Sequence, residues 1–315
     1  MRFSVVIPLF NKAPYVEKAL RSVISQTFQD FEIIVVDDGS SDNSYIVAKQ
    51  VLDASPIEHC LIQQSNSGVS TARNNGVTAS KGDFICFLDA DDWWSSTFLE
   101  RMDYLIHEHP EAGIYGTNYY YVKNGRQRIC VANAETGIIN YCKVYSEGLA
   151  MPLTSISVSL SRSVFNEFGG FKPNLRLGED FDLWIRIALK YKVAFLSEPL
   201  AFYFQDSNKE WRAVGRLHSP QEHMLWNLSY LEEEERSNHD YKQLIDKLRV
   251  NNLFPYYISN QYREAAKHEL EKVDWSIQPF NKRLIYKLPI YILKSYRIIM
   301  RTGSSIKQVL AQAFK

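Results

Sequence analysis

Residues 84–94 read Phe-Ile-Cys-Phe-Leu-Asp-Ala-Asp-Asp-Trp-Trp, and this stretch decides which fold the sequence predicts. Its first half is short and apolar, with β-branched and aromatic side chains and no polar face, which is typical of a strand buried on both sides. Asp89, Asp91 and Asp92 follow at once, and their carboxylates repel one another unless a cation or hydrogen-bond donors hold them. The stretch therefore predicts a buried strand that ends in a cluster of acids.

Two interpretations of these aspartates stay open. Carboxylate oxygens at the end of a strand suit Mg²⁺ or Mn²⁺, and Mg²⁺ typically takes one or two carboxylates, with the rest of its shell from water and substrate phosphate. A divalent ion that bridges the protein to a diphosphate is therefore the first hypothesis. The alternative is that the aspartates form a turn and cap a helix that begins near Ser95, because Asp favours both positions.

Strand-like and helix-like segments alternate around this stretch. Apolar runs predict strands, and apolar residues at helical spacing predict helices, so that we expect strands at 3–7, 31–36, 57–62 and 84–88 and helices at 15–27, 45–52 and 70–79. Pro8 is expected to stop the first strand. Such alternation predicts an α/β fold with a mostly parallel, Rossmann-like sheet flanked by helices.

Polar clusters follow these strands. They lie at 8–12, 37–41 and 89–92, and a fourth at 66–74 opens a helix. In an open sheet of this kind, ligands bind outside the carboxyl ends of the strands. Arg73 lies about one helical turn inside its helix, and an arginine there suits a diphosphate, although a surface arginine is more often only solvated. No glycine-rich dinucleotide or P-loop motif is present.

Four ordered motifs make the pattern specific. They read Ser-Val-Val-Ile-Pro-Leu-Phe-Asn-Lys at 4–12, Glu-Ile-Ile-Val-Val-Asp-Asp-Gly-Ser-Ser-Asp at 32–42, Asn-Ser-Gly-Val-Ser-Thr-Ala-Arg-Asn at 66–74 and Leu-Asp-Ala-Asp-Asp at 88–92. Together they resemble the donor half of family-2 glycosyltransferases, which have the glycosyltransferase A fold. The resemblance covers about the first hundred residues.

The resemblance implies a nucleotide-sugar site. It places the loop at 8–11 and Asp37 or Asp38 on the base and ribose, Arg73 near the nucleotide and Asp89 near the ribose or the metal. The metal ligands that it implies are Asp91 and Asp89, for Mg²⁺ or Mn²⁺. The full set of nucleotide-sugar-binding residues expected on this basis is Pro8, Phe10, Asn11, Asp37, Asp38, Gly39, Asn66, Gly68, Arg73, Asp89 and Ala90.

A second acid cluster opens a predicted helix after Gly169-Gly170-Phe171. It comprises Glu179, Asp180 and Asp182, and acids at a helix start are stabilised by the helix dipole, which is the simplest interpretation. Sugar transfer onto an alcohol, however, needs a general base for the acceptor hydroxyl. The resemblance places that base on Asp180 and implies inversion at the anomeric carbon. Glu179 is the second candidate, and Asp182 is expected to face solvent.

One departure from the resemblance concerns a basic residue. Related sequences often have a histidine or arginine after a Pro-Leu-x-x-Tyr segment. Here Pro-Leu-Ala-Phe-Tyr at 199–203 is followed by Phe-Gln-Asp-Ser, which contains none. His218 or Arg212 substitutes from farther along the chain, or this contact is missing.

The chain of 315 residues predicts a catalytic domain and a helical region. We expect the catalytic domain at 1–217, with a nucleotide-sugar half at 1–110 and an acceptor half at 111–217, and helices at 218–315. Near the end, the segment 282–301 places lysines and arginines opposite apolar side chains on a predicted helix. This helix either lies on anionic lipid or docks onto the catalytic domain.

Composition limits the location and the partners. Lys plus Arg and Asp plus Glu are both 36, so no basic excess suggests nucleic acid. The four cysteines form no Cys-x-x-Cys pair, which indicates a reducing compartment, and neither a signal peptide nor a membrane-spanning run is apparent. We expect a cytosolic protein, with peripheral membrane association possible.

The sequence as a whole predicts a metal-dependent, inverting hexosyltransferase. The expected donor is a nucleotide-diphosphate sugar, most simply a UDP-sugar, and the expected acceptor is a glycan or lipid-linked glycan of a bacterial surface polysaccharide. Two alternatives remain. One is a sugar nucleotidyltransferase, although its glycine-rich loop is absent from 8–12. The other is a catalytically silent sugar-nucleotide binding or scaffold protein.

Overall fold

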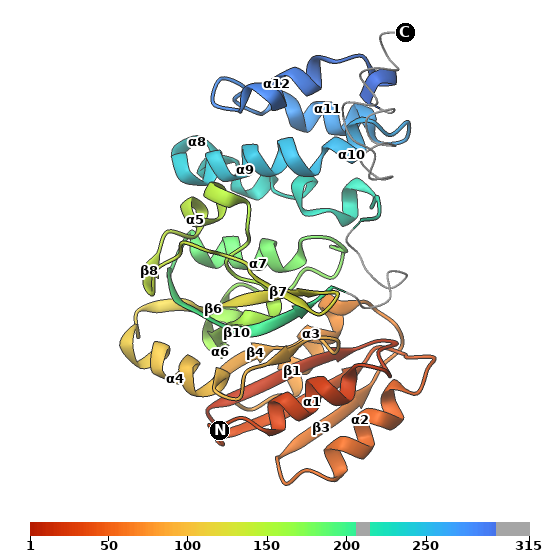
Figure 1. The fold of residues 1–315 in the computed structure, drawn as a ribbon, viewed down its shortest axis with the longest axis vertical. Coiled ribbons are helices and arrows are strands. Elements are labelled where there is room, and N and C mark those ends of the chain that lie inside the picture. Colours follow the sequence, from red (N-terminus) through yellow and green to blue (C-terminus); the bar gives the residue numbers. More distant parts are fainter. Residues whose placement is uncertain (206–214, 294–315) are drawn as a thin grey trace. The chain divides into compact units, whose positions relative to one another are not determined.

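The computed structural model describes residues 1–205 and 215–293. The chain divides into two compact units, Met1–Met224 and Leu225–Lys315. The first unit contains the sheet and every predicted site residue that the structure describes (Figure 1).

One mixed sheet organises the first unit. Its path runs β3-β2-β1-β4-β9-β6-β10-β5, while β7 pairs with β6 and β8 pairs with β10. The strands of the described residues are β1 (Phe3–Leu9), β2 (Phe31–Asp37), β3 (His59–Gln63), β4 (Phe84–Phe87), β5 (Trp93–Trp94), β6 (Ala112–Lys123), β7 (Arg126–Ile129), β8 (Gly137–Ile139), β9 (Val158–Ser161) and β10 (Lys192–Phe204).

Two strands of this path, β9 and β5, run opposite to the others. The four strands from β3 to β4 are parallel, β9 is antiparallel to both β4 and β6, and β10 is again parallel to β6. The parallel strands β1 and β2 are buried along most of their length, as continuous apolar runs require in a sheet covered on both faces. The predicted α/β fold with a largely parallel sheet and flanking helices is therefore confirmed.

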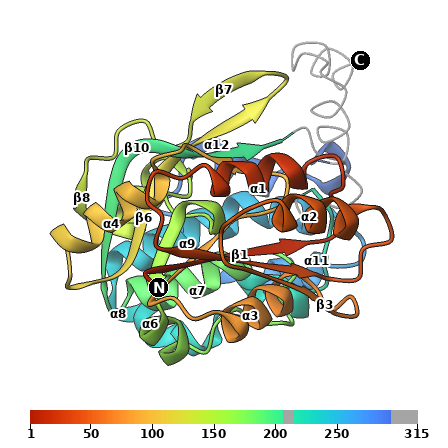
Figure 2. The ribbon, with the colours of Figure 1, turned by 90° about the horizontal axis from the view of Figure 1, so that it is seen from below.

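Helices cover both faces of this sheet. Figure 2 shows α1 and α2 on one side of β1 and β3, and α3 on the other. The helices of the first unit are α1 (Val16–Ile24), α2 (Ser44–Asp53), α3 (Val69–Ala79), α4 (Phe98–Glu108), α5 (Tyr141–Gly148), α6 (Arg162–Glu167) and α7 (Glu179–Ala188). The three helices expected in the first hundred residues correspond to α1, α2 and α3, with ends shifted by a few residues.

Pro8 does not stop the first strand, contrary to the prediction. β1 continues through Pro8 to Leu9, and Pro8 lies opposite Val36 of β2. The Val6 carbonyl accepts a hydrogen bond from the Leu88 amide, so the backbone of Val6 faces β4. The backbone of Pro8, two residues later, faces the same side, where β4 has already ended. The missing N–H of Pro8 therefore costs no ladder bond, which is why the strand accepts a proline there.

The acids after β4 do not cap a helix. They lead into the two-residue strand β5, which pairs with β10, and α4 begins only at Phe98. Its N-cap residue is Thr97, which makes no side-chain capping bond. The aspartates do form a turn, in which the Asp92 amide donates to the Asp89 carbonyl at 3.0 Å, but the expectation that they cap a helix is wrong.

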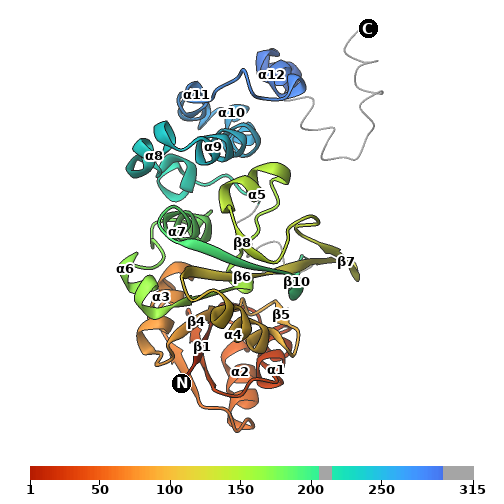
Figure 3. The same cartoon turned by 90° about the vertical axis from the view of Figure 1, so that its left-hand side faces the viewer.

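The second half of the unit adds strands of mixed direction. β6 and β7 form a hairpin at Asn124 and Gly125, which both have positive φ, as a two-residue type I′ turn requires. α7 packs against β6, as Figure 3 shows, and its buried residues include Phe181, Trp184 and Ile185. The start of α7 carries the second acid cluster, as predicted.

The second unit is helical in its described part. It contains α8 (Glu232–Ser237), α9 (His239–Asn252), α10 (Phe254–Tyr257), α11 (Arg263–Glu271) and α12 (Phe280–Lys287). Residues 290–293 are helical as well, and the basic positions Lys294, Arg297 and Arg301 lie outside the described residues. Of the helices that the structure describes, none combines the length and the apolar character needed to cross a bilayer.

Candidate functional site

The loops after β1 and β2 contact each other at the edge of the sheet. Asn11 has a positive φ of 51°, and its side-chain oxygen accepts a hydrogen bond from the Ser41 amide at 2.8 Å. The Asn11 amide donates to Ser40 Oγ at 3.1 Å. Pro8 and Phe10 flank this contact and are half-buried. The first two predicted clusters are therefore joined.

Two buried aspartates hold the next loop. The Asp38 carboxylate accepts the amides of Ser67 at 2.7 Å and Gly68 at 2.8 Å, and Asp37 accepts the Gln63 side chain at 3.2 Å. Asp37 is 1% exposed and Asp38 4%, so their carboxylates serve the protein's own loops. A nucleotide bound here would be contacted by the loop that Asp37 and Asp38 shape, and not by their buried carboxylates.

Gly39 and Gly68 lie where this loop is tightest. Gly39 has a φ of +74°, and a Cβ there would lie 3.0 Å from the Asn66 amide nitrogen. Gly68 has a φ of +91°, and a Cβ there would lie 2.3 Å from the Arg176 guanidinium. Larger residues would be strained at both positions because of the positive φ; at Gly39 a Cβ would also crowd the Asn66 backbone, whereas at Gly68 the flexible Arg176 side chain would have to move.

Arg73 joins the two acid clusters. Its guanidinium forms ion pairs with Asp89 at 2.7 Å and with Glu179 at 3.1 Å, and only 3% of its side chain is exposed. Burial acts to lower the pKa of Arg73, but the charges of Asp89 and Glu179 outweigh it and raise the pKa. The alternative, that Arg73 is a solvated surface arginine, is therefore wrong, and its placement near the nucleotide stays a prediction. Arg73 is a buried link between the ends of β4 and the start of α7.

The acids after β4 have three different surroundings. Asp89 pairs with Arg73, and Asp91 pairs with Lys12 at 2.5 Å. Asp92 is 2% exposed; one of its oxygens accepts the Phe204 amide at 2.6 Å, and the other has no hydrogen-bond partner. Burial, and then the charges of Asp91 and Asp89, raise the pKa of Asp92 well above its ordinary value. The intervening Ala90 is buried, with 2% of the residue exposed.

Within the described residues, Asp180 is the acid of the second cluster that forms no ion pair. Its carboxylate accepts the amide of Phe181 at 2.7 Å, and it is half-buried. Burial, and then the charge of Glu179, raise its pKa to about 7, although the charge of Arg73 opposes this shift. A general base works best with a pKa near the operating pH, so Asp180 is suited to accept and release a proton.

Asp182 does not face solvent, contrary to the prediction. It is fully buried and pairs with Lys172 at 2.7 Å and with Arg186 at 3.0 Å. Arg186 also donates to the carbonyls of Phe168 and Gly170. Asp182 thus holds the loop that precedes α7, and the glycine pair belongs to this scaffold.

Sequence reasoning missed three further residues. Asn74 clamps the backbone of Phe171, donating to its carbonyl at 2.8 Å and accepting its amide at 3.0 Å. Lys12 pairs with Asp91, and Arg176 lies against Gly68. Asn74 is the neighbour of Arg73 on α3, so two consecutive side chains reach the second half of the unit. Only the strand order, and not the motif, brings these partners together.

Of the two basic residues expected near the donor, Arg212 lies outside the described residues. His218 is followed by the segment 219–224, which bonds back to the strand-like residues before α7. The amides of Arg176 and Leu177 donate to the Glu222 carbonyl, at 2.8 and 3.1 Å. His223 is buried there, and burial followed by the charge of His218 lowers its pKa to about 4. A role for His218 at the donor stays a prediction.

The residues at the end of β4 fit a divalent ion only as partial ligands. Over residues 1–205 and 215–293, no group of three or more His, Cys, Asp or Glu side chains is arranged to hold a metal. Asp91 offers one carboxylate that is 15% exposed and is held by a flexible lysine, and Mg²⁺ usually completes its shell with water and phosphate oxygens. Asp91 is therefore suited to an ion that arrives with a diphosphate.

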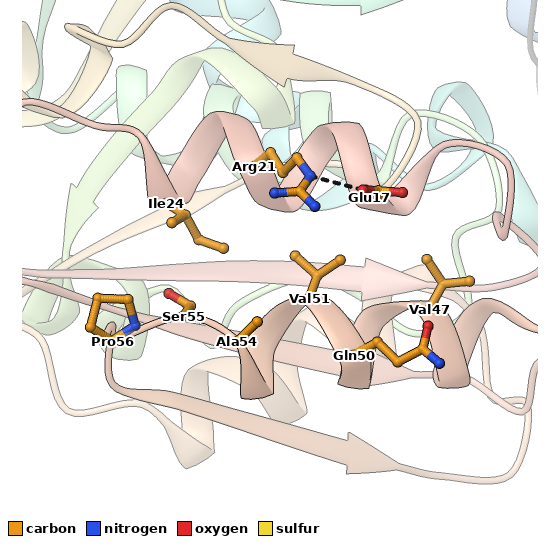
Figure 4. A pocket seen from close by; sticks show the side chains of 9 residues that line it. All are labelled: Glu17, Arg21, Ile24, Val47, Gln50, Val51, Ala54, Ser55 and Pro56. Carbon is orange, nitrogen blue, oxygen red and sulfur yellow. Dashed lines mark hydrogen bonds and ion pairs between the residues drawn. The ribbon is translucent and has the colours of Figure 1, made fainter.

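A hollow elsewhere in the unit does not belong to this site. Figure 4 shows that it lies between α1 and α2 and not at the carboxyl ends of the strands. Its volume is about 250 Å³, and its lining is Glu17, Arg21, Ile24, Val47, Gln50, Val51, Ala54, Ser55 and Pro56.

Comparisons with known proteins agree with this geometry. Residues 4–151 match the profile of "Glycosyl transferase family 2". Over 121 residues the chain is 37% identical to glycosyltransferase GlyA of Streptococcus pneumoniae, covering 38% of this chain and 17% of GlyA. It is 34% identical to the uncharacterized glycosyltransferase EpsJ of Bacillus subtilis over 124 residues, 39% of this chain and 36% of EpsJ. The chain thus spans well under half the length of these curated relatives.

Solved structures share the fold. Staphylococcus aureus TarS 1–349 in complex with UDP-GlcNAc superposes with a TM-score of 0.63 at 19% identity, covering 92% of this chain and 76% of TarS 1–349. Mannosyltransferase PcManGT of Pyrobaculum calidifontis, in complex with GDP-Man and Mn²⁺, gives a TM-score of 0.57 at 14% identity, covering 98% of this chain and 85% of that one. The segment 4–151 thus belongs to glycosyltransferase family 2, and the chain has the glycosyltransferase A fold.

Proposed function

We propose that this protein transfers a sugar from a nucleotide-diphosphate donor to an acceptor hydroxyl, with inversion at the anomeric carbon. One observation supports this most directly: a single buried guanidinium, that of Arg73, binds both Asp89 and Glu179. It thereby places Asp180, with its raised pKa of about 7, beside the loops that resemble a donor site. Single displacement requires a donor site and, next to it, a general base whose pKa lies near the operating pH.

The reaction has two parts, deprotonation of the acceptor hydroxyl and departure of the nucleoside diphosphate. The acceptor hydroxyl gives its proton to the Asp180 carboxylate as its oxygen forms a bond to the anomeric carbon. On the opposite face, the bond between that carbon and the diphosphate oxygen breaks, and the nucleoside diphosphate leaves with the electron pair. A positioned general base typically contributes a factor of about a hundred to ten thousand to the rate.

The donor would bind across the carboxyl ends of β1, β2 and β4. The loops shaped by Asn11, Asp37 and Asp38 would hold the base and ribose, and Gly39, Asn66 and Gly68 would let the backbone approach closely. A uridine donor is proposed because TarS, which shares the fold, was solved with UDP-GlcNAc. The sugar would be a hexose or its derivative.

A divalent ion would be held by Asp91, with Asp89 near it. When bound, Mg²⁺ or Mn²⁺ neutralises charge on the departing diphosphate. PcManGT, which shares the fold, was solved with Mn²⁺ beside its donor. In this chain Arg73 would add a second positive charge close to Asp89.

The acceptor is proposed to be a glycan or lipid-linked glycan of a surface polysaccharide, reached at the membrane. Large apolar side chains are exposed in the last described part of the chain, with Phe280 71%, Leu284 48% and Tyr291 68% exposed. Apolar and basic side chains together favour an anionic lipid surface. Deleting residues 282–315 should release the protein from membranes in a sedimentation assay, and an unchanged membrane fraction would contradict this part.

The activity is tested by incubating the purified protein and Mn²⁺ with a panel of UDP-sugars, with and without membrane lipid extract, and measuring free UDP. We expect acceptor-dependent release that falls by about a hundredfold or more in Asp180→Asn. The control is Asp53→Asn, which changes the same side chain in an exposed pair with Lys49 and should keep full activity. If no UDP-sugar is turned over and calorimetry detects no UDP binding, the proposed donor is wrong.

A further inference from the structure

Lys12 is held in place by its backbone at the carboxyl end of β1. Its amide donates to Ser44 Oγ at 2.7 Å, and its carbonyl accepts the amides of Tyr15 at 2.8 Å and Val16 at 3.0 Å at the start of α1. Because β1 and β4 are neighbours in the sheet, the side chain reaches the acids after β4. Its ammonium lies 2.5 Å from Asp91, and each side chain is only 15% exposed.

The two cations of this acid cluster differ in freedom. Arg73 is 3% exposed and is fixed by two carboxylates, Asp89 and Glu179. Among the described residues Lys12 forms one ion pair, to Asp91, at the end of a side chain with four rotatable bonds, and a lysine ammonium can move among partners. Lys12 is therefore the cation that can leave the cluster without disrupting the link between β4 and α7.

The cluster also has an unsatisfied acceptor. Among the described residues, one oxygen of the buried Asp92 has no hydrogen-bond partner, and Asp92 directly follows Asp91. An unpaired buried carboxylate oxygen is unfavourable, and additional positive charge nearby would stabilise it. Lys12 therefore pairs with Asp91 but leaves one acceptor oxygen of the cluster, on Asp92, unsatisfied.

We propose that Lys12 couples divalent-ion binding to nucleotide binding. Without nucleotide, its ammonium neutralises Asp91 and competes with the ion. When a nucleoside diphosphate binds, the ammonium moves to the diphosphate oxygens, and Asp91 becomes available to the ion. This inference rests on the proposed function only in naming the nucleoside diphosphate, because the competition between Lys12 and a cation for Asp91 is a property of the free protein.

The consequence is a reciprocal coupling. If nucleotide raises the affinity for the ion through Lys12, the ion must raise the affinity for nucleotide by the same factor. The enzyme would then avoid loading the ion alone and would bind ion and donor together.

The test measures Mn²⁺ binding by the electron paramagnetic resonance signal of free Mn²⁺, with and without saturating UDP. Without UDP, Lys12→Met should bind Mn²⁺ about tenfold more tightly than the natural protein, because Asp91 loses its competing cation. UDP should tighten Mn²⁺ binding by about tenfold or more in the natural protein and clearly less in Lys12→Met. Lys12→Arg should retain the coupling.

Two controls make the result specific. Lys49→Met removes the same charge from an exposed pair with Asp53 and should behave as the natural protein does. Asp91→Asn should remove Mn²⁺ binding in every background, and circular dichroism of each variant establishes that it is folded.

Equal nucleotide-free Mn²⁺ affinities of Lys12→Met and the natural protein would overturn the inference, as would an absence of Mn²⁺ binding to Lys12→Met. The proposed function fails separately, if calorimetry detects no binding of UDP or of any other nucleoside diphosphate. In that case the nucleotide-free comparison still decides whether Lys12 and a divalent ion compete for Asp91.

Discussion

The acids after β4 and the acids at the start of α7 are alike in composition and differ in the cations around them. Each cluster has three carboxylates within four residues, and in each one carboxylate pairs with Arg73. The other two acids of each cluster differ in which of them has a cation beside it. Their comparison teaches that the position of the cations, and not the acidic motif, decides what each carboxylate can do.

The buried acids show this first. Asp182 is paired with both Lys172 and Arg186. Asp92 has a backbone amide on one oxygen and nothing on the other, and burial raises its pKa. One buried carboxyl is therefore stabilised as an anion, and the other favours its neutral form.

The acids with proposed roles show the reverse. Asp91, the proposed ligand of a cation, already has the ammonium of Lys12 at 2.5 Å. Asp180, the proposed base, has no cation in direct contact in the described part of the chain, and its pKa rises to about 7. A carboxylate that already pairs with an ammonium is suited to exchange it for a metal ion, whereas a carboxylate without a cation in contact is suited to proton transfer.

Removing the shared cation should have the largest effect. Arg73→Met leaves Asp89 and Glu179 unpaired, and breaking such a buried pair typically costs about 3–5 kcal/mol. We expect the free energy of unfolding in urea at pH 7 to fall by about 4 kcal/mol. Arg101→Met is the control, because its pair with Glu198 is exposed and should matter by less than about 1 kcal/mol. Equal losses in the two variants would mean that Arg73 is not a structural link.

Neutralising the paired buried acid should have the next largest effect. Asp182→Asn leaves two cations, Lys172 and Arg186, without their carboxylate and loosens the loop before α7. Because Lys172 is partly exposed, we expect a loss near the low end of the range for buried pairs, about 3 kcal/mol in urea unfolding. A loss below about 1 kcal/mol would show that this network contributes little.

The pH dependence of stability tests the raised pKa of Asp180. Its folded pKa of about 7 lies above its ordinary value of 3.8, so between these values the folded protein holds a proton that the unfolded chain has released. Ionisation of Asp180 therefore costs stability as pH rises through this window. Asp180→Asn should be more stable than the natural protein at pH 8, on the order of 1–2 kcal/mol after allowance for partial exposure, and equally stable at pH 4. A variant that is less stable at pH 8 would refute the assignment.

The smallest effect is expected at the unpaired buried acid. Asparagine is a neutral substitute for a protonated carboxyl, and its oxygen can still accept the Phe204 amide. Asp92→Asn should therefore change the free energy of unfolding at pH 7 by less than about 1 kcal/mol. Destabilisation comparable to that of Asp182→Asn would show that Asp92 is an anion and would remove the contrast between the two buried acids.

Much of this arrangement was predictable from local pattern. The apolar run before Asp89 and the acids at the start of α7 could be placed because periodicity and strand ends are local properties. The strands of mixed direction, β5 and β9, were not predicted, because their partners are distant in sequence. Pro8 was misjudged for the same reason, since its tolerance depends on where β4 ends.

The errors in the site have two origins, a local partner that was overlooked and partners that are distant in sequence. Asp182 was expected in solvent although Arg186, one helical turn later, was a readable partner; its second partner, Lys172, comes from a loop ten residues earlier. Arg73 has partners 16 and 106 residues away, and Lys12 has one 79 residues away. Ion pairs over such separations follow from the order of strands in the sheet, which a single sequence does not display.

The most direct test is a carbon-13 NMR titration of aspartate carboxyl groups in the natural protein, with the Asp180 signal assigned by its absence in Asp180→Asn. The account predicts that this signal titrates with a pKa near 7, and that Arg73→Met moves it higher because a nearby positive charge is lost. A pKa close to the ordinary value of 3.8 would contradict the account, because Asp180 would then be fully ionised at neutral pH and not a poised base.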